Sequence, residues 1–265
     1  ACRPTIGGKT KFVCIDGPEF DGAQVDWDEM FKRMGTFKDV EREEMEHFKE
    51  HLATIDAEKK KETTDITMDV EPTDASIEEL TDRNAEWRKE LRASMKAKER
   101  TAIERVKMPE LDPVYRATTR TEEVNIGLTK EMALTEAKRC LDCPKPTCME
   151  GCPVSINIPS FIKNIERGQF LAAAKVLKNT SALPAVCGRV CPQEKQCESR
   201  CVHLKMNKPA VAIGYLERFA ADYERQSGNI SIPEKDPANG IKVAVVGSGP
   251  AGLSFAGDMA KKGFE

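Results

Sequence analysis

Eight of the ten cysteines in this 265-residue chain fall between Cys140 and Cys201, in two groups of four. The groups read Cys140-x2-Cys143-x4-Cys148-x3-Cys152-Pro153 and Cys187-x3-Cys191-x5-Cys197-x3-Cys201. A [4Fe–4S] cube needs a ligand at each of its four irons, and one tight Cys-x2-Cys loop reaches two adjacent irons. Because a third cysteine follows a few residues on and the fourth ligand must come from elsewhere, the spacing predicts two [4Fe–4S] clusters.

The bacterial ferredoxin run C-x2-C-x2-C-x3-C-P sends its last cysteine to the other cluster of a pair. The same crossing here predicts a first cluster bound by Cys140, Cys143, Cys148 and Cys201. It predicts a second cluster bound by Cys152, Cys191 and Cys197. The second cluster then lacks one ligand, for which Cys187 and a carboxylate are both candidates. Without a ligand role, Cys187 would be a buried apolar cysteine.

Structural zinc is the main alternative, and it is typically held by two C-x2-C knuckles separated by a spacer. This chain has a single C-x2-C pair, followed by Cys148 and by Cys152-Pro153. A disulfide framework is typical of short secreted domains, whereas this chain is longer and begins with no secretory signal pattern. The sequence therefore favours iron–sulfur clusters over a zinc-stabilised interaction module without a redox role.

The composition argues against several other classes of function. The formal net charge is −3, so the basic stripe of a nucleic-acid-binding protein is not expected. Charged residues make up 32% of the chain, and the mean hydropathy is −0.50. No apolar run approaches the roughly 18 residues that cross a bilayer. We expect a soluble, cytoplasmic protein that binds neither a membrane nor nucleic acid.

A second cofactor motif lies near the end of the sequence. Val243–Val246 has the pattern of a buried parallel strand, and Gly247-x-Gly249-x-x-Gly252 follows at once, before a helical pattern. Gly247 would allow the tight turn, Gly249 the approach of a pyrophosphate, and Gly252 the packing of helix on strand. We predict that residues 240–265 form the first βα unit of a Rossmann-type FAD domain, whose site is truncated because the next strand is missing.

The elements that must position the cysteines are mainly helical. Thr129 is a good N-cap for a helix that leads to Cys140. Pro159 and Pro209 each open a further helical pattern. We therefore predict a mainly α fold, in which a helical domain over residues 107–230 holds both [4Fe–4S] clusters.

The beginning of the chain has a different character. Gly7-Gly8 lies between two short β-type runs and predicts a tight hairpin turn. Asp26-Trp27 opens a short helical pattern, and a second helix is expected from about residue 38 to 52. We interpret residues 1–36 as a small β-hairpin fragment, the C-terminal remnant of a separate domain.

Residues 37–106 are interpreted as a charged helical linker. The segment from residue 56 to 76 is polar and holds three consecutive lysines. Ser76 and Glu79 match a capping box. A long charged helix is predicted to follow, up to about Val106, and to act as a solvated connector.

The residues around the cysteines resemble a known family. The matching runs are Met108-Pro109-Glu110, Ala137-Lys138-Arg139-Cys140-Leu141-Asp142-Cys143, Gly151-Cys152-Pro153 and Leu183-Pro184-Ala185-Val186-Cys187-Gly188-Arg189-Val190-Cys191-Pro192-Gln193-Glu194. They are similar to the small subunit of NADPH-dependent glutamate synthase and to the large subunit of NADH-dependent reduced ferredoxin:NADP+ oxidoreductase. The N-terminal part of dihydropyrimidine dehydrogenase shares the module. The resemblance covers about residues 105–265.

This resemblance implies a helical domain with two [4Fe–4S] clusters, followed by an FAD domain and an NADPH domain. It supports the crossed ligand assignment and implies that Cys187 is not a ligand. The last ligand of the second cluster is implied to be Glu217, in the run Ala212-Ile213-Gly214-Tyr215-Leu216-Glu217-Arg218. Without the resemblance, Glu217 would be interpreted as a surface carboxylate near Arg218.

Residues 1 to about 50 resemble a second family, the electron-transfer subunit of the dihydroorotate dehydrogenase type. This is also the small subunit of the ferredoxin:NADP+ enzyme. The matching runs are Ile6 to Gly22 and Val25-Asp26-Trp27. In that family a [2Fe–2S] cluster is bound by cysteines, and Cys2 and Cys14 match the last two. The earlier ligands are missing, so a complete [2Fe–2S] site is expected only in a longer parent protein.

These features together predict the electron-transfer segment of a flavin and iron–sulfur oxidoreductase. Electrons would pass between FAD or NADP(H) and the clusters, and no side chain is expected to act as catalytic acid, base or nucleophile. The partner would be a redox subunit or domain, such as ferredoxin or the large subunit of glutamate synthase. Because both ends look like cuts through larger domains, we expect the parent to be a fusion of the two subunits, which favours ferredoxin:NADP+ chemistry.

Overall fold

The computed structural model describes residues 5–10, 22–35 and 74–265. The chain falls into two compact units, residues 1–68 and 69–265, and each is described by itself. Among the described residues, no helix is both long enough and apolar enough to cross a membrane.

A small β-hairpin opens the first unit. Strand β1 (Thr5–Ile6) pairs antiparallel with strand β2 (Lys9–Thr10). Gly7 and Gly8 join them with φ angles of 55° and 74°. A two-residue hairpin turn with positive φ at both positions matches the twist of the strands and suits glycine. The predicted hairpin turn is therefore confirmed.

The short helix predicted after Asp26 is also present. It is α2 (Trp27–Gly35), and the 3-10 turn η1 (Gly22–Gln24) precedes it. The carboxylate of Asp26 accepts a hydrogen bond from the backbone N–H of Glu29 at 2.9 Å, which caps the helix. Three predicted features lie outside the described residues: the Cys2 and Cys14 pair, the helix over 38–52, and most of the linker over 56–76.

Four helices form the core of the second unit. They are α8 (Lys130–Lys138), α10 (Ile158–Glu166), α11 (Phe170–Lys178) and α13 (Ile213–Ser227). Helix α10 contacts each of the other three, and α11 also packs on α13. Phe161, Leu177 and Leu216 are fully buried between them. This apolar burial is the main force holding the helices together.

The starts of these helices follow the sequence signals closely. The hydroxyl of Thr129 accepts from the backbone N–H of Met132 at 3.3 Å, so the predicted cap of α8 is confirmed. Asn157 caps α10 in the same way. Helix α13 begins at Ile213, four residues after the position that Pro209 suggests.

Short helical turns contain or directly border five of the eight cysteines in the two groups. They are α9 (Thr147–Glu150), α12 (Pro184–Val190), η3 (Gln193–Lys195), η4 (Glu198–Arg200) and η5 (Val202–Met206). Hydrophobic periodicity does not predict them, because it needs a window of about 11 residues or more. Helix α12 packs along α13.

Residues 77–102, predicted to lie in one long solvated helix, form three short helices that we call the arm. These are α4 (Ile77–Thr81), α5 (Glu86–Ser94) and α6 (Ala97–Ala102). The predicted capping box is confirmed, with Ser76 and Glu79 each bonding the backbone N–H of the other. Leu80 and Arg88 are only 1% and 2% exposed. The prediction of a solvated connector is therefore wrong.

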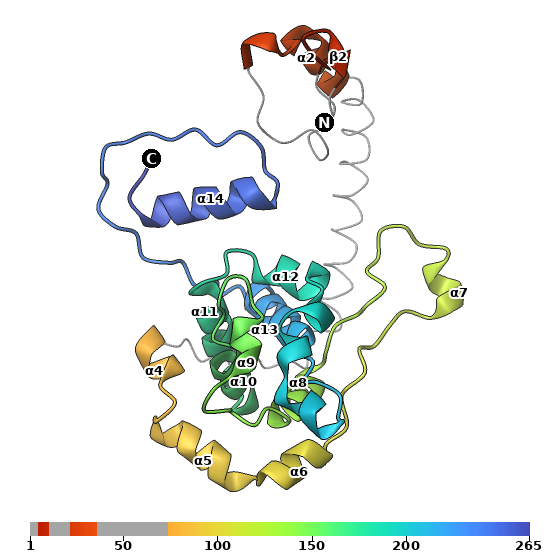
Figure 1. The fold of residues 1–265 in the computed structure, drawn as a ribbon, viewed down its shortest axis with the longest axis vertical. Helices are drawn as coiled ribbons and strands as arrows, with labels where there is room; N and C mark the ends of the chain where they lie inside the picture. The colour runs from red at the N-terminus through yellow and green to blue at the C-terminus, as the bar shows by residue number, and fades with distance from the viewer. Residues whose placement is uncertain (1–4, 11–21, 36–73) are drawn as a thin grey trace. The chain divides into compact units, whose positions relative to one another are not determined.

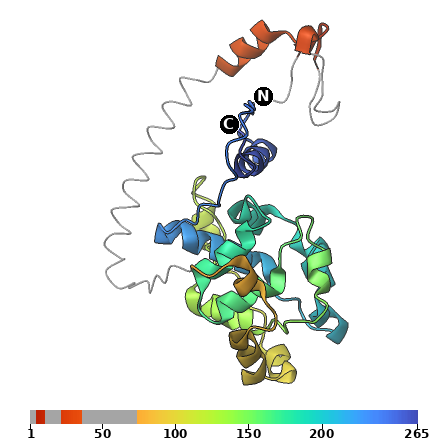
Figure 2. The same ribbon diagram turned by 90° about the vertical axis from the view of Figure 1, so that its left-hand side faces the viewer.

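The arm follows one end of the helical body in both views (Figure 1, Figure 2). Helix α4 contacts α10 and α11. Helix α4 ends at Thr81, where one continuous helix was predicted. The backbone N–H of Asn84 donates to the side chain of Asp82 at 2.8 Å at this break. Asp and Asn side chains stabilise such turns by replacing helical hydrogen bonds.

Helix α7 (Pro113–Arg116) lies in the segment between the arm and α8. The two ends of this segment meet in an isolated antiparallel bridge between Glu110 and Asn125. Asp112 caps α7 by accepting from the backbone N–H of Val114 at 2.9 Å. The helix is a single turn within the extended segment.

The last helix is α14 (Pro250–Lys261), which follows Gly249 as its N-cap. No strand is assigned to Val243–Val246, so the predicted βα unit is not shown by this fold. Val243 N–H donates to the carbonyl of Glu265 at 2.7 Å, and Glu265 N–H donates to Ile241 at 3.0 Å. A strand requires a longer ladder of such bonds on a sheet, and these two are too few.

Candidate metal centres

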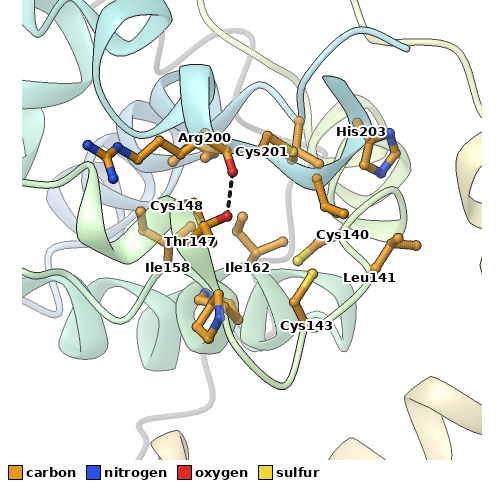
Figure 3. A pocket seen from close by; sticks show the side chains of 15 residues that line it. Cys140, Leu141, Cys143, Thr147, Cys148, Ile158, Ile162, Arg200, Cys201 and His203 are labelled. Atoms are coloured by element: carbon orange, nitrogen blue, oxygen red, sulfur yellow. Dashed lines mark hydrogen bonds between the residues drawn. The ribbon is translucent and has the colours of Figure 1, made fainter. Parts of the chain in front are cut away.

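Four cysteines from both groups line one pocket, which we call the first site (Figure 3): Cys140, Cys143, Cys148 and Cys201. The end of α8 presents the first of them, and the next lies on the loop that follows. Helix α9 and the end of η4 present the other two. Ile158 and Ile162 of α10 add apolar lining. The structure thus brings together the four cysteines predicted for the first cluster.

Two close backbone contacts hold the two cysteine groups against each other. The hydroxyl of Thr147 donates to the backbone carbonyl of Arg200 at 2.6 Å (Figure 3). A Cβ added at Gly151 would lie 2.6 Å from the carbonyl oxygen of Gln196, closer than any side chain permits. The chain just before Cys152 therefore approaches the second group only because residue 151 is glycine.

The remaining predicted ligands form a second site: Cys152, Cys191, Cys197 and Glu217. Cys191 ends α12, Cys197 precedes η4, and Glu217 lies on α13. The thiols of Cys191 and Cys197 both interact electrostatically with Cys152 and with Glu217. The structure therefore also brings together the three cysteines and the carboxylate assigned to the second cluster.

Glu217 is the most informative member of the second site. Its residue is only 5% exposed, and its Oε1 atom has no hydrogen-bond partner. Burial raises the pKa of this carboxyl to about 7. A buried polar atom without a partner is costly, so the position suits a carboxylate that receives a metal. Arg218, its neighbour in sequence, pairs with Glu123 and Asp222.

Cys187 lies close to the second site as well. It sits on α12, one helical turn before Cys191, and its thiol interacts with that of Cys191. The hydroxyl of Ser181 is 3.9 Å from the Cys187 sulfur. Both candidates for the last ligand, Cys187 and Glu217, are therefore next to Cys191.

Burial acts on the acidity of most of these thiols. It raises the pKa of the Cys140 and Cys191 thiols to about 11 and that of Cys197 to about 12. It also raises the pKa of Cys143 and Cys148. Thiolates bind metals, so the positive charge of a bound metal must offset this burial, and binding releases protons.

The spacing of the donors differs from that of a single-ion site. Among residues 5–10, 22–35 and 74–265, no three His, Cys, Asp or Glu side chains lie close enough to share one metal ion. Zinc–sulfur bonds of about 2.3 Å in a tetrahedron put the sulfurs about 3.8 Å apart. The ligands of a [4Fe–4S] cube each bind a different iron.

Sequence reasoning assigned no role to two residues that shape these sites. Asp142, between Cys140 and Cys143, is 1% exposed and forms ion pairs with arginines of the arm. Gly188 lies where α12 meets α13, and an added Cβ would stand 2.5 Å from the backbone nitrogen of Arg218. Gly188 could have been singled out from the sequence, because a glycine directly beside a cysteine can mark a close backbone contact. Asp142 could not, because its partners lie about 50 residues upstream in sequence.

The glycines of the predicted dinucleotide motif have geometry suited to a tight turn. Gly247 has a φ of 101°. A Cβ at Gly252 would lie 2.5 Å from the carbonyl oxygen of Gly247, so the helix start needs glycine there. Around Gly249 the space is open. These facts leave the binding of FAD as a prediction.

Residues 116–229 match a protein-family model described as dihydropyrimidine dehydrogenase domain II, 4Fe-4S cluster. The chain carries a [4Fe–4S] domain. The matched residues of this [4Fe–4S] domain include both cysteine sites and Glu217, so the prediction of iron–sulfur chemistry is confirmed at the level of the domain.

Several curated proteins are similar to the chain. The small chain of glutamate synthase [NADPH] from Azospirillum brasilense is 35% identical over 60% of this chain and 33% of its own length. Subunit PreT of the NAD-dependent dihydropyrimidine dehydrogenase of Escherichia coli is 37% identical, over 54% and 34%. The putative oxidoreductase UacF of the same organism is 40% identical, over 54% and 22%.

By their names, these relatives are parts of a glutamate synthase and of a dihydropyrimidine dehydrogenase, and a putative oxidoreductase. The chain spans about a third of the length of the first two relatives and less of the third. Two of the three are named as a chain or subunit of a larger enzyme. The resemblance of residues 1–50 to a second family stays a prediction.

Proposed function

We propose that the chain is the electron-transfer segment of an iron–sulfur flavoprotein oxidoreductase, with two [4Fe–4S] clusters on interleaved ligands. The first cluster is assigned to Cys140, Cys143, Cys148 and Cys201. The second is assigned to Cys152, Cys191, Cys197 and Glu217. The observation that carries this proposal is the pocket in which Cys201 meets three cysteines of the other group.

The chain's own residues hold the clusters and shape their surroundings. When bound, the clusters accept and release single electrons. Ile158, Ile162 and Val211 line the first site and exclude water from it. Glu217 gives the second site an oxygen donor, and the type of ligand is one determinant of reduction potential. The two clusters would therefore differ in potential.

The reaction of the longer parent protein is proposed from the relatives and from the flanking segments. Electrons would move between FAD or NADP(H) and the clusters, and then to a partner such as ferredoxin or the large subunit of glutamate synthase. FAD would bind at the motif of Gly247, Gly249 and Gly252 in a longer parent. Cys2 and Cys14 would contribute to a [2Fe–2S] cluster in that parent, and the protein would act in the cytoplasm.

Metal analysis of the chain purified without oxygen tests this proposal. Two [4Fe–4S] clusters predict about eight iron atoms and about eight sulfides per chain, with a brown colour that fades on reduction. A colourless protein with one zinc per four cysteines would contradict it. That result would instead support a zinc-stabilised interaction module without a redox role.

A further inference from the structure

Asp142 occupies the centre of the loop that presents Cys140 and Cys143. Its φ is 51°, in the left-handed region that side chains other than glycine seldom adopt. Asp and Asn tolerate this region best, because their short polar groups bond locally. Here the carboxylate is fully buried, so the loop keeps its shape only if that charge has partners.

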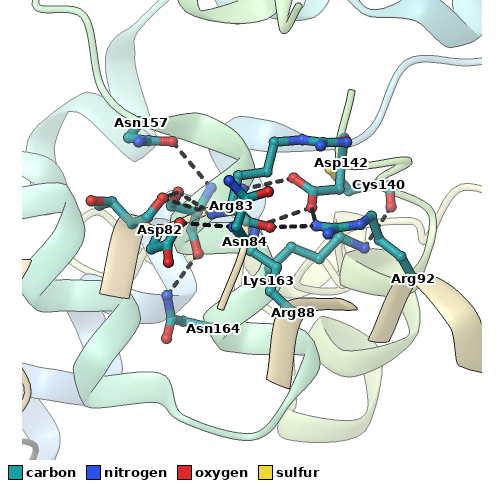
Figure 4. A network of polar contacts seen from close by, with 12 residues as sticks. Asp82, Arg83, Asn84, Arg88, Arg92, Cys140, Asp142, Asn157, Lys163 and Asn164 are labelled. Atoms are coloured by element: carbon teal, nitrogen blue, oxygen red, sulfur yellow. Dashed lines mark hydrogen bonds and ion pairs between the residues drawn. The ribbon is translucent and has the colours of Figure 1, made fainter. Parts of the chain in front are cut away.

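Arg88 of α5 supplies the main partner (Figure 4). Its Nε and Nη2 atoms donate to the two carboxylate oxygens of Asp142 at 3.0 and 2.7 Å, a bidentate pair. Its Nη1 atom donates to the carbonyl of Thr81 at 3.0 Å and to the hydroxyl of Ser160 at 2.8 Å. All three nitrogens of the Arg88 guanidinium thus donate hydrogen bonds, to Asp142, to the arm and to α10. These bonds hold the side chain away from water.

Two more arginines of the arm reach the same residue. Arg92 donates to the Asp142 carboxylate at 2.7 Å and to the carbonyl of Arg83 at 2.9 Å. Arg83 in turn donates to the backbone carbonyl of Asp142 at 2.9 Å. Three arginine side chains therefore bind the carboxylate and the backbone carbonyl of Asp142, so positive charge exceeds negative charge beside this loop.

The other end of the loop is bound in a similar way. Lys163 of α10 donates to the backbone carbonyl of Cys140 at 2.6 Å (Figure 4). Lys163 also pairs with Glu166, which pairs with Arg100 of the arm at 2.8 Å. The arm thus binds Asp142 directly, and it is linked to the Cys140 end of the loop through Glu166 and Lys163.

The two sites differ in the sign of the charges near them. Around the first site, Arg88 and Arg92 pair with the Asp142 carboxylate, and Arg83 and Lys163 donate to the backbone carbonyls of Asp142 and Cys140, so cations outnumber that carboxylate. Around the second, Glu198 pairs with Arg105 at 2.8 Å, whereas the buried carboxylate of Glu217 has an oxygen without a hydrogen-bond partner. Reduction adds negative charge to a cluster, so nearby cations raise its potential and nearby anions lower it.

We propose that the arm is a cationic clasp that positions the ligand loop of the first cluster and raises its reduction potential, with Arg88 and Arg92 as the positioning residues. This inference rests on the proposed function, since it requires a cluster at the first site. It gives the arm a redox role, and it sets the order of the two potentials, with the first cluster the easier to reduce.

A double-mutant cycle on the full chain, reconstituted without oxygen, tests the clasp. The variants are Arg88→Met, Asp142→Asn and the two together, with redox titration of both clusters by electron paramagnetic resonance. The signal of the first cluster is the one that Cys143→Ala removes. Lys89→Met is the matched control, because Lys89 is on the same helix and pairs with exposed Glu86.

The clasp predicts shifts of opposite sign at the first cluster. Arg88→Met should lower its midpoint potential, Asp142→Asn should raise it, and the double variant should return near the wild-type value. The second cluster and the Lys89→Met protein should not shift. Loss of the first cluster alone in Arg88→Met, regained in the double variant, also supports the positioning role.

Shifts of the same sign in both single variants, or none beyond the Lys89→Met control, would overturn the clasp. If Arg88→Met fails to fold, Arg92→Met decides by the same criterion, since its side chain is 24% exposed and less critical to packing. A wild-type chain without two clusters would instead overturn the proposed function, so the two failures are distinguishable.

Discussion

At the scale of single residues, Glu217 shows how burial supports a candidate ligand that the residues alone do not single out. A carboxylate next to an arginine on a helix is usually a solvated surface pair. Here Arg218 turns to Glu123 and Asp222, and it leaves Glu217 buried with an unpartnered oxygen. A side chain in that position either costs folding free energy or serves a metal.

Replacing Glu217 with Ala should therefore damage one cluster and spare the other. The expected result is a loss of about four irons per chain and of one paramagnetic signal. Iron analysis of the purified variant, with spectra of the reduced protein, measures both. Glu194→Ala is the control, because Glu194 lies nearby on η3 and is exposed. Two intact clusters in Glu217→Ala would show that another group, such as Cys187, is the ligand.

The grouping of the candidate ligands was more predictable than the residues that position them. Cysteine spacing carries the chemistry of an iron–sulfur site directly in the sequence, and the crossing of Cys152 and Cys201 followed from a known precedent. Asp142 was not predictable, because its role depends on Arg88 and Arg92, which reach it only in the folded chain. The last ligand required the resemblance as well as the residues.

At the scale of elements, the arm shows why charge alone misled the prediction. Arg88 and Arg100 looked solvated because their pattern is polar, yet both are about 97–98% buried against carboxylates elsewhere in the chain. Asp82 and Asn84 did signal a break in the helix, and the structure uses them for a turn. The capping box and the N-cap at Thr129 depend on neighbours within four residues, so they were predictable.

The contact of α12 with α13 provides the prediction at this scale. Gly188→Ala would place a Cβ 2.5 Å from the backbone of α13 and force the helices apart. Such overpacking costs about 1–3 kcal/mol, and it should also separate Cys191 from Glu217. We expect a lower free energy of unfolding and selective loss of the second cluster, measured by denaturant titration and iron analysis.

Gly257→Ala is the matched control for that experiment. Gly257 lies on α14, and nothing stands within 4 Å of an added Cβ there. Alanine should therefore be neutral or stabilise the helix by up to about 1 kcal/mol. If Gly188→Ala keeps the second cluster and the stability of the control, the close approach of α12 to α13 does not hold the second site.

At the scale of the whole molecule, the chain combines a helical [4Fe–4S] domain with shorter flanking segments. The domain match covers residues 116–229, and the proposal of electron transfer in an oxidoreductase is argued from this match and from the relatives. Of the predicted FAD unit, the helix is present as α14, whereas the strand is not assigned, because two backbone hydrogen bonds do not make a sheet edge. Hydrophobic pattern predicts that a strand can form, whereas the strand itself depends on neighbouring strands.

The interleaving of the two sites is the central claim, and removal of Cys201 tests it most directly. The paramagnetic signals of reduced Cys201→Ala should be compared with those of Cys143→Ala and of Cys197→Ala, all prepared without oxygen. Interleaved ligands predict that Cys201→Ala and Cys143→Ala lose the same cluster, although Cys201 is close in sequence to Cys197. If Cys201→Ala loses the cluster that Cys197→Ala loses, the two sites are local groups and the interleaved assignment is wrong.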